Sequence, residues 1–228
     1  RKGRQNMKKI RAVLFDMDGL MFDTQRLWDK AWKQAGEACG VPMGEEQIAP
    51  LRGRSLADSR AAFEKNVAPG DVFDRCNTMA DALVREWLRG DVPMKHGLLP
   101  LLAYLQKTGR AMAVVSSTEQ NLVKDLLQRT GILNYFSAVV CGDMVRHSKP
   151  APDIYLLGAQ RVNVPPAHCL VLEDSENGAR AGLAAGCRTV VVPDVAPVAQ
   201  QVLAAAAAVV PSLEDVITLL EEDEKTQK

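Results

Sequence analysis

The sequence predicts an α/β fold with a doubly wound parallel sheet and a small helical domain inserted near its start. Three observations support this prediction. Short apolar runs recur along the chain, helical patterns separate most of them, and one long interval, Thr24–Met94, contains helical patterns but no convincing strand. Strands that alternate with helices are typical of a parallel sheet with helices on both faces.

The predicted strands are short and continuously apolar, as strands buried on both faces of a parallel sheet are. They lie at Ile10–Phe15, Ala111–Val115, Ala138–Cys141, Cys169–Leu172, Thr189–Val192 and Val209–Val210. The helices between them are predicted at Leu98–Lys107, Gln120–Thr130, Ile154–Arg161, Ala179–Ala185 and Val198–Ala207. We expect the Ala204–Ala208 run to be a packed helix end. We expect the charged tail Glu221–Lys228 to be frayed.

The interval Thr24–Met94 contains two clear amphipathic helices. Apolar residues recur at helical spacing from Leu27 to Cys39 and again from Val72 to Trp87. We therefore predict a Rossmann-like core formed by residues 8–23 and 95–228, with a helical cap formed by residues 24–94. Residues 1–7 are expected to be disordered or foreign to the native protein, with Met7 as a candidate native start.

Composition limits the partners that this chain can have. It has 228 residues, 28 of them basic and 28 acidic, so its formal net charge is zero. This balance gives no support to nucleic-acid or membrane-surface binding through bulk charge. No apolar run approaches the ~18 residues of a membrane span. The five scattered cysteines, without a C-x-x-C pair, predict free thiols in a reducing cytoplasm. We expect a monomer whose partner is a small molecule.

Polar side chains follow four of the predicted strands where each strand ends. They are Asp16 and Asp18, Ser116–Thr118, Asp143 with the later Lys149, and Glu173–Ser175. The carboxyl ends of parallel strands meet at one edge of a sheet, where ligands bind. Carboxylates gathered there repel one another unless a cation lies among them, and an all-oxygen ligand set favours Mg²⁺. A lysine and a hydroxyl beside that ion suit a phosphate, so the pattern predicts phosphoryl chemistry.

Each of these motifs has an ordinary structural interpretation when it is taken alone. The D-x-D-G motif at Asp16 is compatible with a turn, Ser116-Ser117 with a helix cap, and Lys149-Pro150 with a solvated turn. An EF-hand is excluded, because the twelfth position from Asp16 is Leu27, where a bidentate Glu is required. The order of the motifs, each at the end of an apolar strand, favours a joint site.

Four motifs in this order, "DMDG", "SST", "SKPAPDIY" and "LEDSENGARAGLAAG", resemble those of the haloacid dehalogenase-like hydrolase superfamily over residues 8–220. The chain is most similar to the β-phosphoglucomutase-like branch of small phosphatases and phosphomutases, which carry a helical cap. The resemblance implies that Asp16 is the nucleophile and Asp18 the general acid and base. It implies that Ser116 bonds the transferring phosphoryl group and that Lys149 neutralises its charge. The implied Mg²⁺ ligands are Asp16, the Asp18 backbone carbonyl, Glu173 and Asp174.

The function implied is that of a Mg²⁺-dependent phosphatase acting through an aspartyl-phosphate on a small metabolite, either a sugar phosphate or a nucleotide-like monoester. A β-phosphoglucomutase-type activity is the alternative. The mutases carry a histidine and an arginine in the cap where this sequence has Trp28 and Leu56, which favours the phosphatase. Ser117, Arg52 and Arg54 are candidate substrate-binding residues, although the two arginines are equally compatible with a solvated surface. The cap is expected to hinge near residues 22–24 and 92–97.

Two non-catalytic alternatives come from other protein classes. A phospho-receiver domain also gathers acids and a Lys-Pro at strand ends, but it is shorter, carries adjacent acids after its first strand and has no such insert. A silent phosphometabolite-binding module is disfavoured because every catalytic position is filled. Dehalogenation is disfavoured as well, because it has no use for Asp18 or Asp174.

Overall fold

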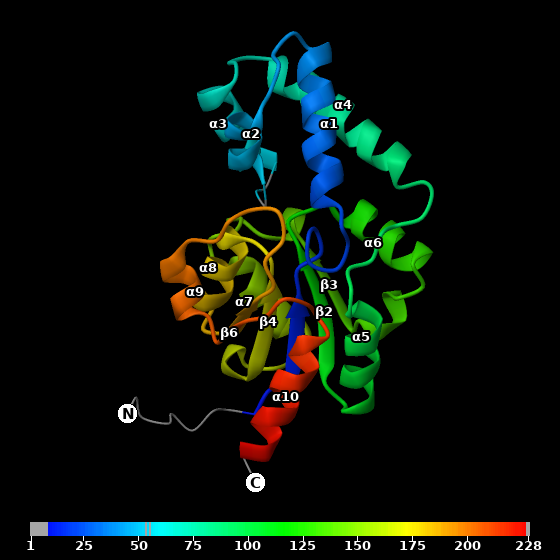
Figure 1. Cartoon of the computed structure of the whole chain (residues 1–228), viewed down its shortest axis with the longest axis vertical. Coiled ribbons are helices and arrows are strands. Elements are labelled where there is room, and N and C mark those ends of the chain that lie inside the picture. Colours follow the sequence, from blue (N-terminus) through cyan, green and yellow to red (C-terminus); the bar gives the residue numbers. More distant parts are fainter. Residues whose placement is uncertain (1–8, 53, 55, 227–228) are drawn as a thin grey trace.

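The protein has a six-stranded, entirely parallel sheet in the order β3-β2-β1-β4-β5-β6. The structure is a computed structural model that describes residues 9–52, 54 and 56–226, so the predicted extension 1–7 lies outside the described residues. The strands are β1 (Ala12–Phe15), β2 (Ala111–Ser116), β3 (Ala138–Cys141), β4 (Cys169–Glu173), β5 (Arg188–Val191) and β6 (Ala208–Val209). The predicted parallel sheet is confirmed (Figure 1).

Helices cover both faces of the sheet, which is why most strand positions are apolar; the polar exceptions are Ser116, Glu173, Arg188 and Thr189. They are α5 (Leu98–Lys107), α6 (Gln120–Arg129), α7 (Asp153–Arg161), α8 (Glu176–Ala184), α9 (Gln200–Ala205) and α10 (Asp215–Thr226), with short 3₁₀ turns η2 (Leu133–Tyr135), η3 (Gly142–Met144) and η4 (Pro166–His168). Successive strand residues point to opposite faces. Accordingly, Val13 and Phe15 of β1 belong to the cluster with α5, α6 and α10, whereas Ala12 and Leu14 belong to the cluster with α7 and α8.

The strand order fixes where a ligand site is expected. From β1 the chain runs outward to β2 and β3 on one side, then crosses to β4, β5 and β6 on the other. The topological switch point therefore lies between β1 and β4, which pair in parallel from Ala12↔Cys169 to Phe15↔Leu172. In open α/β sheets, ligands bind at the carboxyl edge beside such a point. The residues that directly follow β1 and β4 are thus placed to meet a ligand.

A separate helical group stands beyond this carboxyl edge (Figure 1). It consists of α1 (Gln25–Ala38), α2 (Glu45–Ile48), the 3₁₀ turn η1 (Ala49–Leu51), α3 (Leu56–Asn66) and α4 (Val72–Trp87). Its centre is aromatic: the rings of Trp32, Phe63 and Phe73 lie 5.4 to 6.0 Å apart between centroids. Of these helices, α1 and α4 correspond to the two amphipathic patterns in the sequence.

Two linkers join the helical group to the sheet and run side by side. Phe22 and Met94 form an antiparallel bridge. The Asp23 N–H donates to the Pro93 carbonyl at 2.8 Å, and the Lys95 N–H donates to the Met21 carbonyl at 2.8 Å. The chain therefore leaves and re-enters the core at one place, close to the end of β1.

Two expectations near the C-terminus were wrong. Most of the segment predicted to be frayed continues α10, as far as Thr226, because Asp223 is 8% exposed and forms an ion pair with Arg188 of β5. Residues 227–228 of that segment lie outside the described residues. The Ala204–Ala208 run was expected to be the end of a helix, but only its first two residues are helical. Helix α9 ends at Ala205 and β6 begins at Ala208, since the Ala207 N–H donates to the Thr189 carbonyl at 2.8 Å and draws the chain into the sheet.

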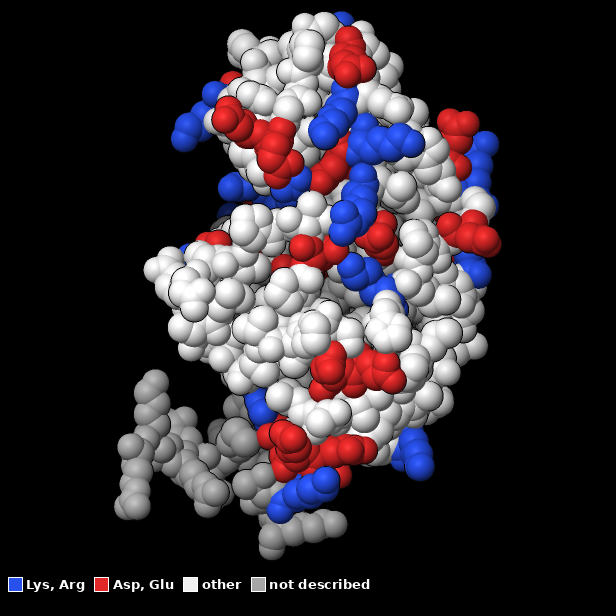
Figure 2. All heavy atoms as spheres, in the orientation of Figure 1, with Lys and Arg blue, Asp and Glu red and all other residues white. Residues whose placement is uncertain are grey.

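The surface carries no obvious single-sign field on the face that Figure 2 shows. Acidic and basic side chains are interspersed there, in keeping with the formal net charge of zero. None of the helices in the described ranges has the length and apolar character that crossing a bilayer requires.

Candidate active site

A cavity of about 410 Å³ lies between the carboxyl edge of the sheet and the helical group. Its size is within the range of small-molecule sites. From the core it is lined by Asp16, Asp18, Ser117, Thr118, Lys149 and Asp174, among others. The helical group contributes Trp28, Asp29, Arg52, Arg54, Asn77 and Asp81, among others. Residues from distant parts of the sequence thus share one cavity.

Asp16 and Asp18 lie at the end of β1 and are held in different ways. The Asp16 N–H donates to the Leu172 carbonyl of β4 at 3.0 Å, which continues the sheet to the first acid. The Asp18 carboxylate accepts a hydrogen bond from the Thr24 hydroxyl at 2.6 Å and another from the Thr118 hydroxyl at 2.7 Å. Both carboxylates line the cavity, so the D-x-D spacing delivers two acids to one place.

Lys149 joins the ends of β1 and β4. Its ammonium group lies 2.5 Å from Asp16 Oδ1 and 2.7 Å from Glu173 Oε1, and its side chain is 2% exposed. Burial alone would lower the pKa of this amine, but the adjacent Asp16 and Glu173 outweigh burial and raise the pKa above its usual value. Lys149 is therefore charged at neutral pH and pairs with two acids.

Glu173 is completely buried and is held from three sides. Besides Lys149, it accepts the Tyr155 hydroxyl at 2.5 Å and the Ser175 hydroxyl at 3.0 Å. Burial, and then the nearby Glu173, raise the pKa of Tyr155 well above its usual value, so this phenol stays a donor. A Cβ atom at Gly178 would come within 1.8 Å of Glu173 Oε1, so α8 can approach the carboxylate only with glycine at this position.

Asp16, Glu173 and Asp174 form a buried acidic cluster. One carboxylate oxygen of each lies within 4.8 Å of the others. Burial, and then the neighbouring carboxylates, raise the pKa values of Asp16 and Asp174 well above the usual range. Three ionised carboxylates and the Lys149 ammonium would leave two negative charges uncompensated. The donor set is all oxygen and fits a hard divalent cation such as Mg²⁺.

The structure brings most of the candidate residues from the sequence together around the cavity. The difference is in the "SST" motif, where Ser116 is buried and does not line the cavity. Ser116, at the end of β2, is 1% exposed, and its hydroxyl accepts a hydrogen bond from the Thr118 N–H at 3.1 Å. Ser117 and Thr118 line the cavity itself. Thr118 and Thr24 are the two threonines that hold Asp18. Sequence analysis placed Thr118 in the "SST" motif without giving it a role of its own, and it did not single out Thr24, whose only signal was a place shortly after the "DMDG" motif.

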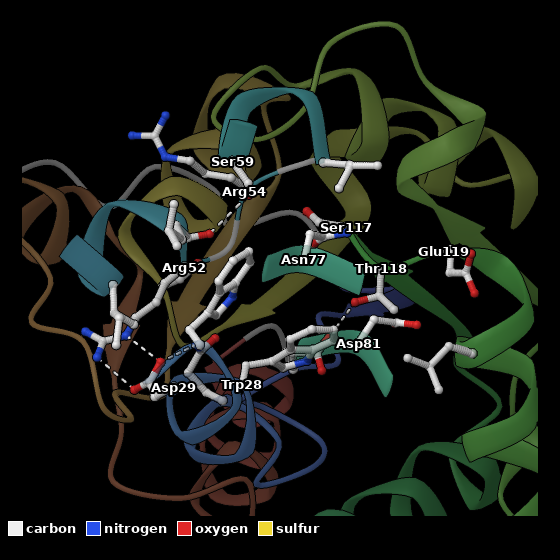
Figure 3. Close-up of a pocket in the computed structure, with 18 of the residues that line it drawn as sticks. Trp28, Asp29, Arg52, Arg54, Ser59, Asn77, Asp81, Ser117, Thr118 and Glu119 are labelled. Atoms are coloured by element: carbon white, nitrogen blue, oxygen red, sulfur yellow. Dashed lines mark hydrogen bonds and ion pairs between the residues drawn. The ribbon is translucent and has the colours of Figure 1, made fainter. Parts of the chain in front are cut away.

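The two candidate arginines of the helical group have different surroundings. Arg52 donates to Asp29 at 2.7 and 3.0 Å and to Glu45 at 2.6 and 2.8 Å, and its side chain is 7% exposed. These partners raise the pKa of Arg52 further above its usual value. Figure 3 shows Arg52 joined to Asp29 by dashed lines. Arg54 is exposed and also lines the cavity.

Comparison with known proteins agrees with this geometry. The profile of the haloacid dehalogenase-like hydrolases matches residues 13–192. The chain is 35% identical over 182 residues to the fructose-1-phosphate phosphatase YqaB of Escherichia coli (strain K12), covering 78% of this chain and 94% of the relative. It is 30% identical over 190 residues to the phosphorylated carbohydrates phosphatase of Thermotoga maritima, covering 78% of this chain and 82% of the relative.

A solved structure shows the same overall fold. The crystal structure of CbbY from Rhodobacter sphaeroides in complex with phosphate superposes with a TM-score of 0.76 at 28% identity, covering 91% of this chain and 96% of CbbY. The family resemblance predicted from the four motifs is thus confirmed by both sequence and fold.

Proposed function

The chain belongs to the haloacid dehalogenase-like hydrolases, in their β-phosphoglucomutase-like branch, and from this premise we propose that it is a Mg²⁺-dependent phosphatase of a small phosphorylated carbohydrate. The observation that carries the proposal is the contact of Lys149 with both Asp16 and Glu173, beside Asp174 and at the floor of the cavity. The relatives support the substrate class, since one is named for fructose 1-phosphate and another for phosphorylated carbohydrates.

In this proposal the reaction has two steps on the chain's own residues. The Asp16 carboxylate attacks phosphorus and the bond to the leaving oxygen breaks, which gives an aspartyl-phosphate. Asp18 donates a proton to the leaving oxygen, then takes one from the water that hydrolyses the intermediate. Its bonds to Thr24 and Thr118 hold the Asp18 carboxylate in place beside Asp16.

Charge is the main electrostatic problem of phosphoryl transfer. Lys149 lies 2.5 Å from the nucleophile and offsets part of the negative charge on Asp16 and on the transferring group. We propose that Asp16, the Asp18 carbonyl, Asp174 and Glu173 hold Mg²⁺, with Glu173 acting directly or through water. Bound there, the cation supplies Lewis-acid stabilisation of the phosphoryl oxygens. Ser116 and Ser117 are proposed to bond those oxygens.

We propose that residues 24–94 act as a cap that closes over the cavity. The paired linkers at Phe22 and Met94 give such a movement one narrow hinge. Contacts that the closed arrangement would use include the Arg85–Glu119 ion pair and a hydrogen bond between Ser148 and Asp58. Closure would exclude bulk water from the reaction and strengthen local electrostatics.

A phosphatase is preferred to a mutase because Trp28 and Leu56 line the cavity where the mutases carry the histidine and arginine of the resemblance. A sugar phosphate is preferred to a nucleotide-like monoester because of the named relatives. The receiver and the silent binding module are not retained, since the family is one of hydrolases. The monomeric state and the cytoplasmic location, the latter in keeping with five free cysteines, stay predictions.

The test is phosphate release from a panel of esters at saturating MgCl₂. The panel contains fructose 1-phosphate, hexitol phosphates, glucose phosphates, ribose 5-phosphate, nucleoside monophosphates and p-nitrophenyl phosphate. We expect hydrolysis with the highest kcat/KM for a sugar or polyol phosphate. Conversion of β-glucose 1-phosphate to glucose 6-phosphate without phosphate release would support the mutase instead. No turnover of any ester would reject the proposed function.

We predict different effects when the two arginines are replaced. Arg54→Ala should raise KM by about tenfold for esters with a second anionic group and change it little for simple monophosphates, because Arg54 forms no ion pair with the described residues and is available to a ligand. Arg52→Ala should instead lower the free energy of unfolding by about 1–3 kcal/mol, because Asp29 loses its charged partner. Steady-state kinetics and urea denaturation measure the two effects.

The matched control is Arg75→Ala, which removes an exposed arginine of α4 that does not line the cavity. This variant should resemble the wild type in KM and in stability. Equal KM values for wild type and Arg54→Ala across bisphosphates and monophosphates would contradict the role given to Arg54. An undiminished unfolding free energy of Arg52→Ala would contradict the structural role given to Arg52.

We also predict that Mg²⁺ binds more tightly as pH rises. Burial and neighbouring acids raise the pKa values of Asp16 and Asp174, so the metal-free site retains protons that the cation must displace. Raising the pH removes these protons beforehand, which increases affinity by up to about tenfold per pH unit for each proton displaced. Calorimetric titration with MgCl₂ at pH 6, 7 and 8 measures this; a constant Kd would contradict it.

A further inference from the structure

Asp194, in the loop that follows β5, is a buried acid that the reaction described above does not use. Its side chain is 3% exposed. One carboxylate oxygen, Oδ1, accepts from the Lys95 ammonium at 2.7 Å and lies 3.8 Å from the Arg26 guanidinium. The other oxygen, Oδ2, is buried and has no hydrogen-bond partner among the described residues. A buried carboxylate oxygen without a donor is unusual, because its lost hydration is not replaced.

The unpartnered oxygen lies beside the proposed cation site. A Cβ atom built on Gly19 would come 2.3 Å from Asp174 Oδ2 and 3.4 Å from Asp194 Oδ2. The two carboxylate oxygens therefore both lie on the side of Gly19 where a side chain would be, in the turn that follows Asp18. Gly19 has a φ of +87°, and its missing side chain leaves room for both acids.

Electrostatics agree with this placement. Asp194 is one of the acids that raise the pKa of Asp174, after burial and after Asp16 and Glu173. Lys95 neutralises Asp194 only on its Oδ1 side. The Oδ2 side thus adds negative charge to a site that already lacks positive charge, which a cation or its bound water would relieve.

The other side of Asp194 faces the two linkers of the helical group. Lys95 lies on the returning linker, where its N–H donates to the Met21 carbonyl at 2.8 Å. Arg26 is the second residue of α1, just after the outgoing linker. Asp194 Oδ2 therefore lies beside the proposed cation site. Asp194 Oδ1 lies near Lys95 on the returning linker and near Arg26 just after the outgoing linker.

We propose that Asp194 is a positioning residue of the cation site and couples cation binding to the linkers. Its Oδ2 accepts a hydrogen bond from a water molecule on the bound cation, while its Oδ1 holds Lys95 and attracts Arg26. Binding of the cation then fixes the carboxylate, and the fixed carboxylate orders residues 21–27 and 92–96. This inference rests on the Mg²⁺ site of the proposed function.

The first test is Mg²⁺ affinity, measured by calorimetric titration of the purified, phosphate-free protein with MgCl₂. Asp194→Asn should raise the Kd by about 10- to 100-fold, the usual effect of losing a group that supports metal ligands. The matched control is Asp91→Asn, an exposed acid on the same returning stretch of chain, which should keep the wild-type Kd. An unchanged Kd in a folded Asp194→Asn protein would overturn the proposal.

The second test is hydrogen exchange of backbone amides with and without Mg²⁺, which reports on ordering rather than on activity. Wild type and Asp91→Asn should gain protection in residues 21–27 and 92–96 when Mg²⁺ binds. Lys95→Met leaves the carboxylate in place but removes its link to the returning linker, so it should bind Mg²⁺ without this gain. Equal gains in Lys95→Met and wild type would overturn the coupling.

A third variant separates this inference from the function on which it rests. Asp174→Asn removes a proposed direct ligand and should abolish Mg²⁺ binding. If Asp174→Asn and Asp194→Asn both bind Mg²⁺ like wild type, the proposed metal site itself fails. If only Asp194→Asn binds like wild type, the metal site stands and the role of Asp194 fails.

Discussion

Replacing Asp16 with asparagine is expected to lower kcat by at least ~10³-fold, the lower range for the loss of a central catalytic group. The amide has the shape of the carboxylate but cannot attack phosphorus. The fold should survive, because Lys149 keeps its partner Glu173 at 2.7 Å. Removing one of three clustered carboxylates also relieves repulsion in the metal-free protein. This variant should therefore lose kcat while keeping the stability of the wild type.

The measurement is kcat for p-nitrophenyl phosphate and for the best sugar phosphate, with Tm from circular dichroism beside it. Asp91→Asn serves as the matched Asp→Asn control and should keep wild-type kcat. Acid quenching with a ³²P-labelled ester should trap labelled protein from wild type and none from Asp16→Asn. A folded Asp16→Asn protein with near-native kcat would show that Asp16 is not the nucleophile.

The sheet was predictable because its strands are buried on both faces. Continuous apolar runs locate β1 to β6, with ends that differ from the structure by two residues or fewer. The polar residues at those ends could be assigned to one edge because parallel strands share their direction. Asp16, Lys149, Glu173 and Asp174 meet there as expected.

Features that depend on partners distant in sequence were not predictable. Asp223 looked like part of a solvated tail, and only its contact with Arg188 explains why α10 continues. Arg52 looked like a free cation, but Asp29 and Glu45 engage it across the helical group. Helix α3 has a weak apolar stripe because one of its few buried residues is Ser59, so its pattern was not distinct.

The geometry around Asp18 was hidden for another reason. Thr24 and Thr118 are ordinary residues of a linker and a loop, and nothing local marks them as partners of a carboxylate. Asp194 belongs to the same class, since its neighbours Lys95 and Asp174 come from other parts of the chain. Sequence patterns identify the acids at the sheet edge but not the side chains that orient them.

Removing the divalent cation is expected to abolish turnover, by at least ~10³-fold in excess EDTA. Phosphate-monoester hydrolysis is among the slowest uncatalysed reactions, with enzymatic enhancements up to ~10²¹, so it needs strong electrostatic stabilisation. Among the described residues, Lys149 is the ammonium group bonded to the buried acidic cluster, and it already neutralises charge on Asp16 and Glu173. Without a cation, the acids of the cluster either repel an incoming phosphate as carboxylates or retain protons, and a protonated Asp16 cannot attack phosphorus.

The measurement is phosphate release by the EDTA-treated protein, with metal content checked by plasma mass spectrometry. Adding excess MgCl₂ should restore wild-type kcat, which shows that the treatment removed a cation and did not damage the fold. Circular dichroism of the metal-free protein should keep its helical signal, because a hydrophobic core supports the sheet independently of the cluster. Full turnover by protein shown to be metal-free would contradict the need for Mg²⁺, and with it the assignment of Asp174 as a ligand.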